Sequence, residues 1–258
     1  IKTTDYTINR LVKRMPSAEV LESVVTDLEE SVLLLPESYL TADRVRANRF
    51  VAMALLSRVY LYQGNWAAAS NMASGVLNNS EYVWETDIDK IFLKDCTATI
   101  WQFSPKLDGE NTDEASVFTF QSGPPPFVGL RPSLYTSFEN NDLRKSSWIT
   151  SVTNGTTTWY YASKYKQNGN TGASVENSIV FRMAEQYLIR AEARARQGEL
   201  NNALEDLNKV RSLAGLTPSA ATTMDGIVAA VLEERKHELF TEYGHRFFDL
   251  KRYGILDN

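Results

Sequence analysis

The strongest constraint on the fold is a helical-hairpin pattern that occurs twice at one fixed spacing. The dipeptide Gln-Gly stands at 63–64 and again at 197–198, and Ala69 corresponds to Ala203, all at an offset of 203 − 69 = 134 residues without a gap. In both copies apolar residues recur at helical spacing before and after the glycine, which commonly ends a helix. The constant offset predicts one packing unit that the chain uses twice.

Signals for helix starts and ends divide both ends of the chain into amphipathic helices. The first helix is expected to start at the predicted N-cap Ser17 and to stop before Pro36. Further helices are expected at 44–62, 66–77, 183–196 and 200–213. The helices at 44–62 and 66–77 form one hairpin, and those at 183–196 and 200–213 form the other.

The hairpin unit matches the tetratricopeptide pattern, in which small, aromatic and glycine residues stand at fixed distances. The matching positions are Leu56, Tyr60, Gly64, Trp66 and Ala69. One such hairpin cannot bury its own apolar face, and the two copies are separated by about a hundred residues instead of the ~34 of a contiguous array. We therefore expect the two hairpins to meet in space and the middle of the chain to loop out.

The middle of the chain differs in composition from its ends. It contains the proline run at 124–126, several Asn-Gly and Gly-Asn pairs, many Ser and Thr, and four of the five tryptophans. Turn chemistry of this kind predicts an irregular segment. We expect a single, mainly α domain, with a tetratricopeptide-like superhelical scaffold at 1–79 and 179–258. The segment 80–178 is expected to be a loop-rich insertion that carries a β-hairpin.

Composition and motifs exclude several classes of function. The net charge is −5, with 27 Lys and Arg against 32 Asp and Glu, so nucleic acid is not an expected partner. The apolar runs are far shorter than the ~20 residues that cross a bilayer. The single Cys96 excludes an internal disulfide. Because no nucleophile elbow, phosphate-binding loop or dinucleotide fingerprint is present, we expect neither an enzyme nor a cofactor.

The strongest turn signal in the insertion is the Asn-Gly pair at 154–155, which separates two strand-like runs. If these two residues are the centre of a type I′ turn, Thr150 faces Trp159 and Trp148 faces Tyr161. Strand alternation then predicts that Trp148, Trp159 and Tyr161 share one face of the hairpin.

Two interpretations of this aromatic face are open. Adjacent rings form a flat apolar platform for the C–H faces of sugars, and nearby Thr and Asn side chains can bond to sugar hydroxyls. Alternatively, the same rings pack onto the helices as core. In the first interpretation the ligand-binding residues are Trp148, Trp159, Tyr161 and Phe127, the last of which lies in the loop after the proline run.

The segment at 234–252 closely resembles the signature of the SusD/RagB family; it reads Glu-Arg-Lys-His-Glu-Leu-Phe-Thr-Glu-Tyr-Gly-His-Arg-Phe-Phe-Asp-Leu-Lys-Arg. Other pieces that resemble the family follow in its order at 27–30, 54–66, 132–144 and 181–193. The resemblance covers nearly the whole chain. It lacks the family's N-terminal region, with its signal and lipid-anchoring cysteine, and the C-terminal tail, so we expect a chain truncated at both ends.

The resemblance implies a protein that binds glycans without catalysis at the cell surface. Such a protein would be held at the outer face of the outer membrane by a lipid anchor that lies outside this chain. It would sit as a lid on a SusC-like TonB-dependent transporter and deliver glycan to it. Capture of peptides or of another protein by the same scaffold, as in RagB-like relatives, is the alternative, because tetratricopeptide-like hairpins often present grooves to partner chains.

Taken by itself, the signature segment predicts structure rather than chemistry. Carboxylates and histidines recur in it at i,i+4 spacing, and Arg235, Arg246 and Arg252 offer planar donors to them. We therefore expect a partly buried ion-pair network that fixes the last helices. No metal site is expected, because His237 is not part of a His-Glu-x-x-His motif and His245 is the only other histidine.

Overall fold

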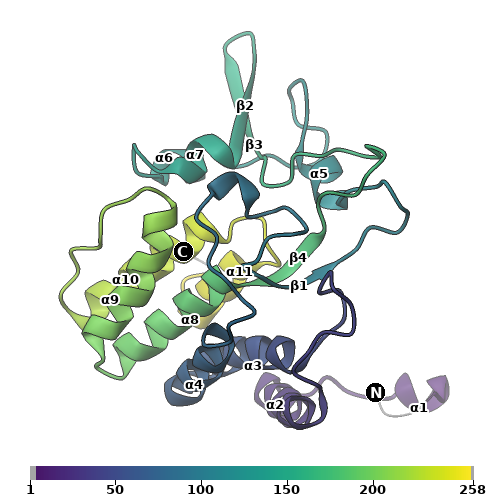
Figure 1. Ribbon diagram of the computed structural model, residues 1–258, viewed down its shortest axis with the longest axis vertical. Coiled ribbons are helices and arrows are strands. Elements are labelled where there is room, and N and C mark those ends of the chain that lie inside the picture. The colour runs from purple at the N-terminus through teal and green to yellow at the C-terminus, as the bar shows by residue number, and fades with distance from the viewer. Residues whose placement is uncertain (1–3, 257–258) are drawn as a thin grey trace.

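The structure is a computed structural model that describes residues 4–256, and it confirms the predicted mainly α architecture (Figure 1). In chain order the elements are α1 (Tyr6–Asn9), α2 (Ser17–Leu34), α3 (Arg49–Gln63), α4 (Trp66–Leu77), the 3-10 helix η1 (Ile88–Lys90), β1 (Thr99–Phe103), α5 (Asp113–Phe118), α6 (Pro132–Ser137), α7 (Leu143–Ser147), β2 (Ile149–Asn154), β3 (Thr157–Ala162), β4 (Ser178–Arg182), α8 (Met183–Arg196), α9 (Leu200–Leu213), α10 (Met224–Glu238) and α11 (His245–Arg252).

Two helical hairpins form the scaffold and pack side by side. The first is α3 with α4, the second is α8 with α9, and α4 lies directly against α8. Their shared cluster includes Leu56, Ala69 and Ala73 from the first hairpin and Ile189 and Ala193 from the second. Alanine at these fully buried positions lets the helix backbones approach closely. The two copies of the sequence pattern therefore meet in space, as predicted.

Further helices extend this array on both sides. On one side α2 packs against α3, and the Tyr60 hydroxyl donates to Glu29 at 2.6 Å. On the other side α10 packs against α8 and α9, and Leu188, Leu207 and Ile227 are fully buried between these helices. The scaffold is thus a row of helices in which each hairpin covers the apolar face of its neighbour.

The predicted bounds of α4, α8 and α9 agree with the structure, and two other helix starts need correction. The helix expected from 44 begins at Arg49, because the Asn48 side chain accepts the Val51 N–H at 3.1 Å and caps it. Arg44 itself has a left-handed φ of 56°. Ser17 is the first helical residue of α2 and not its N-cap, which is Pro16. Gly64 ends α3 with φ 72°, as the pattern predicted.

Two short antiparallel strand pairs form within the insertion and at its junction with the scaffold. β1 pairs with β4, which leads directly into α8, whereas β2 and β3 form a hairpin that projects from the body at the top of Figure 1. Below the base of the hairpin, Trp148, Phe92 and Ile179 belong to a second core cluster with Phe240 of the signature segment. The insertion is therefore joined to the last helices through an apolar core of its own.

The predicted register of the β2–β3 hairpin is wrong by two residues. Trp159 faces Val152 and Tyr161 faces Thr150, and the two turn residues are Gly155 and Thr156. Only Gly155 of these two has a positive φ, 61°, which is the arrangement of a type II′ turn with glycine first. Because Trp159 and Tyr161 are two residues apart on the same strand, they keep the shared face predicted for them whatever the register.

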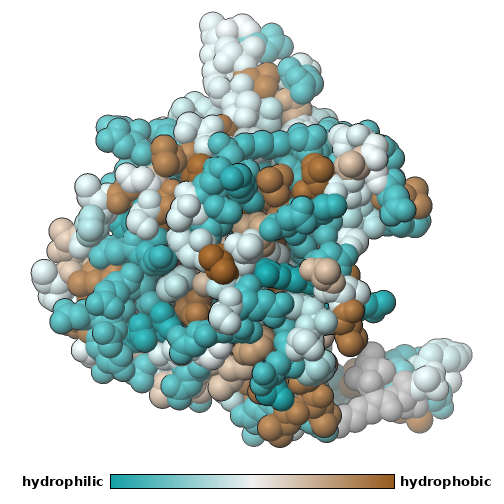
Figure 2. All heavy atoms as spheres, viewed as in Figure 1, coloured by the Kyte–Doolittle hydropathy of each residue, from teal (hydrophilic) through white to brown (hydrophobic). Residues whose placement is uncertain are grey.

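Figure 2 shows a mixed polar and apolar surface, with apolar atoms gathered at the lower edge over α2. Leu33 and Leu34 of this helix are 78% and 74% exposed. The projecting hairpin carries mostly residues of intermediate or polar character. Among residues 4–256 no helix combines the length and the apolar character that a membrane crossing requires.

The packing of α8 against α9 and α10 makes a stability prediction for Leu188. Leu188→Ala is expected to lower the free energy of unfolding by about 2–5 kcal/mol, because it removes fully buried methyl groups and leaves a cavity. The matched control is Leu33→Ala on the exposed side of α2, for which we expect about 0.5 kcal/mol or less. Urea unfolding followed by circular dichroism measures both; equal losses would contradict the described packing.

His237 makes the folded state sensitive to acid. Its ring packs on Phe138 with centroids 4.3 Å apart, its Nε2 lies 2.9 Å from the Ser137 hydroxyl, and burial lowers its pKa to about 4. An unfolded histidine titrates near 6.5, so between about pH 6.5 and pH 4 only the unfolded chain takes up this proton. The free energy of unfolding therefore decreases as the pH is lowered through this range.

We expect His237→Gln to reduce this loss of stability by up to about 3 kcal/mol. Urea unfolding of both proteins at about pH 7 and about pH 4.5 provides the measurement. Identical acid sensitivity of the two proteins would show that His237 is not the group responsible.

Candidate ligand-binding site

A polar cavity of about 420 Å³ lies at the base of the β2–β3 hairpin, and we call it the hairpin cavity. It is lined by Asp89, Thr119, Ser146, Ser147, Thr150, Tyr161, Ser163, Tyr165 and Lys166. These residues come from four parts of the chain: the 3-10 helix, the end of α5, the end of α7 and the hairpin with the residues after it. Only the folded insertion brings them together.

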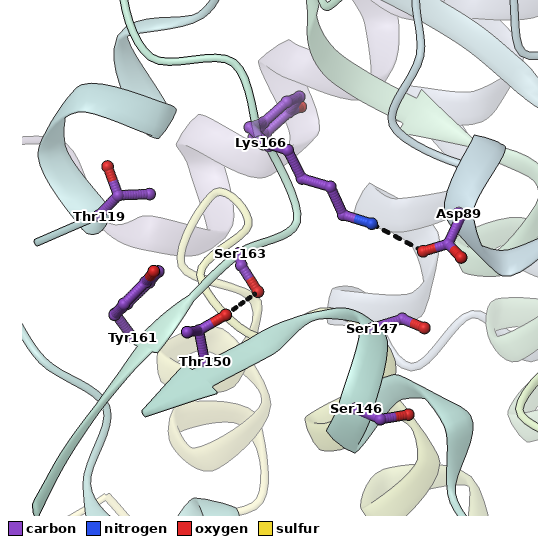
Figure 3. Close-up of a pocket in the computed structure, with 9 residues that line it drawn as sticks. Asp89, Thr119, Ser146, Ser147, Thr150, Tyr161, Ser163 and Lys166 are labelled. Carbon is purple, nitrogen blue, oxygen red and sulfur yellow. Dashed lines mark hydrogen bonds and ion pairs between the residues drawn. The ribbon is translucent and has the colours of Figure 1, made fainter. Parts of the chain in front are cut away.

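Hydroxyl groups dominate the lining of the hairpin cavity (Figure 3). Thr150 donates to Ser163 across the base of the hairpin at 3.0 Å. Lys166 crosses the opposite side and pairs with Asp89 at 2.7 Å. Both partners of this ion pair remain partly exposed, with 44% and 59% of their side chains accessible. The cavity therefore presents hydroxyl donors and acceptors beside one ion pair.

Tyr161 adds an aromatic ring to this polar lining. Its ring packs against Phe120 with centroids 4.9 Å apart, and the side chain stays half-buried at the cavity edge beside Thr119 and Thr150. A ring of this kind offers an apolar face, while the neighbouring hydroxyls offer hydrogen bonds. The arrangement suits a ligand that combines C–H faces with hydroxyls.

Trp159 and Phe127, two other predicted ligand-binding residues, lie outside the lining of the hairpin cavity. The half-buried Trp159 ring rests on Gly123, where an added Cβ would come within 2.1 Å of the indole. Phe127 is 75% exposed in the loop after the proline run. The face shared by Trp159 and Tyr161 is thus partly covered by the segment 120–123, and it is not an open platform.

The prediction that Trp148 belongs to an exposed platform is wrong. Trp148 is only 1% exposed, its ring meets Phe92 edge-on at 5.3 Å, and its indole N–H lies 3.3 Å from the Ile88 carbonyl oxygen that accepts it. The reason is its position, because Trp148 ends α7 before the hairpin begins and its side chain enters the core. For Trp148 the alternative interpretation as core is correct.

Sequence reasoning missed most of the polar lining. Ser163 lies on the same face as Thr150 and Tyr161, so strand alternation carried past β3 could have found it. Asp89, Ser146, Ser147 and Lys166 belong to no motif and reach the cavity only through tertiary packing. Among residues 4–256 no group of three or more His, Cys, Asp or Glu side chains is arranged to hold a metal ion.

Lys164 fastens the cavity-lining residues 161–166 to the signature segment. Its ammonium group donates to the Glu238 carbonyl at 2.8 Å, to the Phe240 carbonyl at 2.9 Å and to the Glu242 carboxylate at 2.5 Å. Burial lowers the pKa of Lys164 to about 8 although Glu242 raises it. The position of Ser163 and Lys166 in the hairpin cavity therefore depends on a buried contact behind them.

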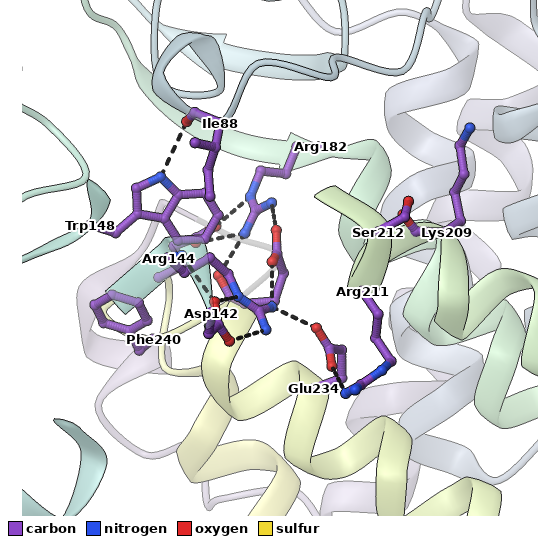
Figure 4. A network of polar contacts seen from close by, with 12 residues as sticks. Ile88, Asp142, Arg144, Trp148, Arg182, Lys209, Arg211, Ser212, Glu234 and Phe240 are labelled. Atoms are coloured by element: carbon purple, nitrogen blue, oxygen red, sulfur yellow. Dashed lines mark hydrogen bonds and ion pairs between the residues drawn. The ribbon is translucent and has the colours of Figure 1, made fainter. Parts of the chain in front are cut away.

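Beneath Lys164, buried arginines and carboxylates form the ion-pair network that the signature predicted (Figure 4). Arg144 pairs with Asp142 at 2.7 Å, with Glu234 at 2.6 Å and with Glu238 at 2.8 Å. Arg182 pairs with the other oxygen of Glu238. Burial raises the pKa of Glu238, but Arg182 and Arg144 outweigh burial and hold it below its usual value.

The donors of this network differ in part from those predicted. Arg235 and Arg252 do pair with Asp249, at 2.8 and 2.9 Å, whereas Arg246 is exposed. The central donors Arg144 and Arg182 come from α7 and β4 and thus from outside the signature. The network therefore joins the insertion to the last helices, in addition to fixing those helices to one another.

Removal of Arg144 is expected to destabilise the protein strongly. Arg144→Met leaves three buried carboxylates without their common partner, and we expect a loss of about 3–5 kcal/mol of unfolding free energy. The matched control is Arg49→Met, which breaks the surface pair with Glu37 and should cost about 1 kcal/mol or less. Denaturant unfolding measures the free energy of unfolding of both variants. If Arg144→Met loses no more of it than Arg49→Met does, Arg144 is not central to the network.

Comparisons with known proteins identify relatives over most of the chain. Residues 62–258 match the family model described as the SusD family. SusD-like protein P25 of Formosa agariphila is 26% identical over 96% of this chain and 57% of its own length. SusD-like protein P2 of the same organism is 25% identical, with 95% of this chain and 58% of the relative covered. The chain thus spans less than three fifths of the length of these relatives.

Solved structures share the same fold. A SusD superfamily protein from Parabacteroides distasonis superposes with a TM-score of 0.80 at 22% identity, over 98% of this chain and 62% of that protein. Surface glycan-binding protein A from Bacteroides thetaiotaomicron gives a TM-score of 0.76 at 21% identity, over 93% and 61% of the two chains. These likenesses agree with the tetratricopeptide-like arrangement of the helices. Because the family match covers well over half of the sequence, the chain belongs to the SusD family.

Proposed function

We propose that this chain binds glycans without catalysing a reaction, and that the hairpin cavity is the binding site. The observation that carries the proposal is the half-buried Tyr161 ring beside the hydroxyls of Thr119, Thr150 and Ser163. A sugar has apolar C–H faces and a rim of hydroxyls, and this lining complements both. One structural relative, surface glycan-binding protein A, is named for glycan binding, which supports the same assignment.

The remaining predicted residues extend the proposed site. Phe127 is exposed in the loop that leads to Leu130, and Leu130 pairs with Tyr160 of β3 by a 2.7 Å backbone hydrogen bond. Trp159 lies on the same face of the hairpin as Tyr161. In the proposal, sugar units beyond the one in the cavity contact Trp159 and Phe127. Trp148 has no direct role, because it is buried.

We place this activity at the cell surface, on the outer face of the outer membrane. There the chain delivers glycan to a SusC-like TonB-dependent transporter, and a lipid anchor outside the 258 residues holds it to the membrane. Membership of the SusD family supports this setting. The alternative sequence interpretation, peptide capture by the same scaffold, is less well matched to the hairpin cavity, because hydroxyls rather than apolar walls line it.

The proposal predicts that Tyr161 matters for glycan affinity. Tyr161→Ala is expected to weaken binding by roughly tenfold, since loss of an aromatic contact is worth about 1 kcal/mol or more. Tyr161→Phe keeps the ring and should retain most of the affinity. Isothermal titration calorimetry against a panel of soluble neutral oligosaccharides is the measurement.

The matched control is Tyr6→Ala, which removes a 71% exposed tyrosine on α1, far along the chain from the cavity. It should leave affinity unchanged. If Tyr161→Ala folds normally and binds glycan as tightly as the unmodified chain, the hairpin cavity is not the site. If no oligosaccharide or polysaccharide binds at all, the glycan assignment itself is wrong.

A further inference from the structure

A second cavity, of about 750 Å³, lies apart from the hairpin cavity, and we call it the α5 cavity. Its walls come from the end of β1, from the segment between β1 and α5, from α5 itself, from the start of β4 and from the turn that follows α10. Phe103, Val117, Phe118, Ser178, Thr241 and Tyr243 are among the residues that line it. In Figure 1 its elements α5, β1 and β4 lie on the side of the molecule away from α9 and α10. No residue lines both this cavity and the hairpin cavity.

Large apolar side chains stand open to solvent on the walls of the α5 cavity. Phe103 is 48% exposed, Tyr243 is 44% exposed and Val117 is 42% exposed. A single exposed apolar residue on a protein surface needs no explanation. Here three such residues converge on one concave surface, although Tyr243 lies more than a hundred positions after Phe103 and Val117 in the sequence, and such convergence is typical of a binding site.

The backbone on one wall is held in an unfavourable conformation. Thr241 and Tyr243 have left-handed φ values of 59° and 41°, which are uncommon for residues other than glycine and rare for a β-branched residue such as Thr. Between them Glu242 is fixed by Lys164 and by Arg182, whose guanidinium contacts it at 2.9 Å. Buried ion pairs thus hold the side chains of Thr241 and Tyr243 in place on the cavity wall.

The rim of the α5 cavity is negatively charged. Glu110, Asp113 and Glu114 line it together with a single cation, Lys106. Glu114 accepts a hydrogen bond from Ser178 at 2.7 Å. The exposed carboxylate of Asp113 forms no ion pair within residues 4–256 and remains available to a ligand. Three carboxylates against one ammonium group favour a ligand that carries positive charge.

From these features we infer that the α5 cavity binds a peptide segment that carries a lysine or arginine side chain. The aliphatic stem of such a residue packs on Phe103, Val117 and Tyr243, and its charged head lies at Asp113 and Glu110. A neutral sugar fits less well, because it would leave the excess of carboxylates at the rim without a positive partner. This site goes beyond the proposed glycan-binding function and does not depend on it.

The test uses the full chain and two blocked peptides, acetyl-Ala-Phe-Lys-Phe-Ala-amide and the same peptide with Gln in place of Lys. Isothermal titration calorimetry should show binding of the lysine peptide and binding at least about tenfold weaker for the glutamine peptide. The affinity for the lysine peptide should fall when salt is raised from about 0.05 M to about 0.5 M, because the charges at the rim are exposed.

Two variants locate the site. Asp113→Asn and Phe103→Ala should each weaken binding of the lysine peptide by about five- to tenfold. The first variant removes the contact to the lysine ammonium group, and the second removes the contact to its aliphatic stem. Both residues are exposed, so both variants should keep the circular dichroism spectrum of the unmodified chain. Asp225→Asn, on exposed α10 surface, and Tyr161→Ala, in the hairpin cavity, are the controls and should leave peptide affinity unchanged.

Several results would overturn the inference. They are equal binding of the two peptides, no binding of either, or undiminished affinity in both Asp113→Asn and Phe103→Ala. Competition by neutral oligosaccharides that disappears in Phe103→Ala would instead make the α5 cavity part of the glycan site. Because Tyr161→Ala affects only the hairpin cavity, loss of glycan binding and loss of peptide binding are separate outcomes.

Discussion

The buried ion pairs around Glu238 and Glu242 are the interaction on which the rest of the structure depends. Arg144 comes from α7, Arg182 from β4 and Lys164 from the segment after β3. These three side chains reach carboxylates at the end of α10 and in the turn that follows it. The insertion contains little regular structure of its own. Because charges removed from water are tolerated only when they are paired with good geometry, this network specifies where the insertion sits on the helical scaffold.

Both cavities owe their shape to this connection. In the sequence, Lys164 lies between Ser163 and Tyr165, which line the hairpin cavity. Glu242 likewise lies between Thr241 and Tyr243, which line the α5 cavity. A small void lined by Lys164 and Glu242, among others, shares Tyr165 with the hairpin cavity and Glu114, Phe118 and Thr241 with the α5 cavity. One buried contact therefore supports both surfaces, so a change at Lys164 would alter both, whereas changes at Tyr161 or Asp113 act on one cavity alone.

The hairpin shows what a sequence pattern can and cannot specify. Alternation along β3 correctly placed Trp159 and Tyr161 on one face, since the period of a strand is independent of the turn. The predicted type I′ turn at Asn154-Gly155 was wrong, because Asn-Gly and Gly-Thr both offer a glycine and the choice between them moves the register by two residues. The predicted register placed Trp148 on the hairpin opposite Tyr161. In the structure α7 extends as far as Ser147, and the indole of Trp148, which follows it, enters the core.

The sequence by itself determined five scaffold helices, the pairing of the two hairpins and the family. Helical periodicity, helix-ending glycines and the 234–252 signature can be recognised in the sequence alone, and the hairpin pattern occurs twice at one fixed spacing. Only the tertiary structure decided which side chains form the two cavities. Residues such as Ser146 and Lys166 gain a place in a site when distant segments pack together, and nothing in their immediate sequence marks them. Burial likewise depends on what lies above a ring, which is why Trp148 and Phe127 differ so much in exposure.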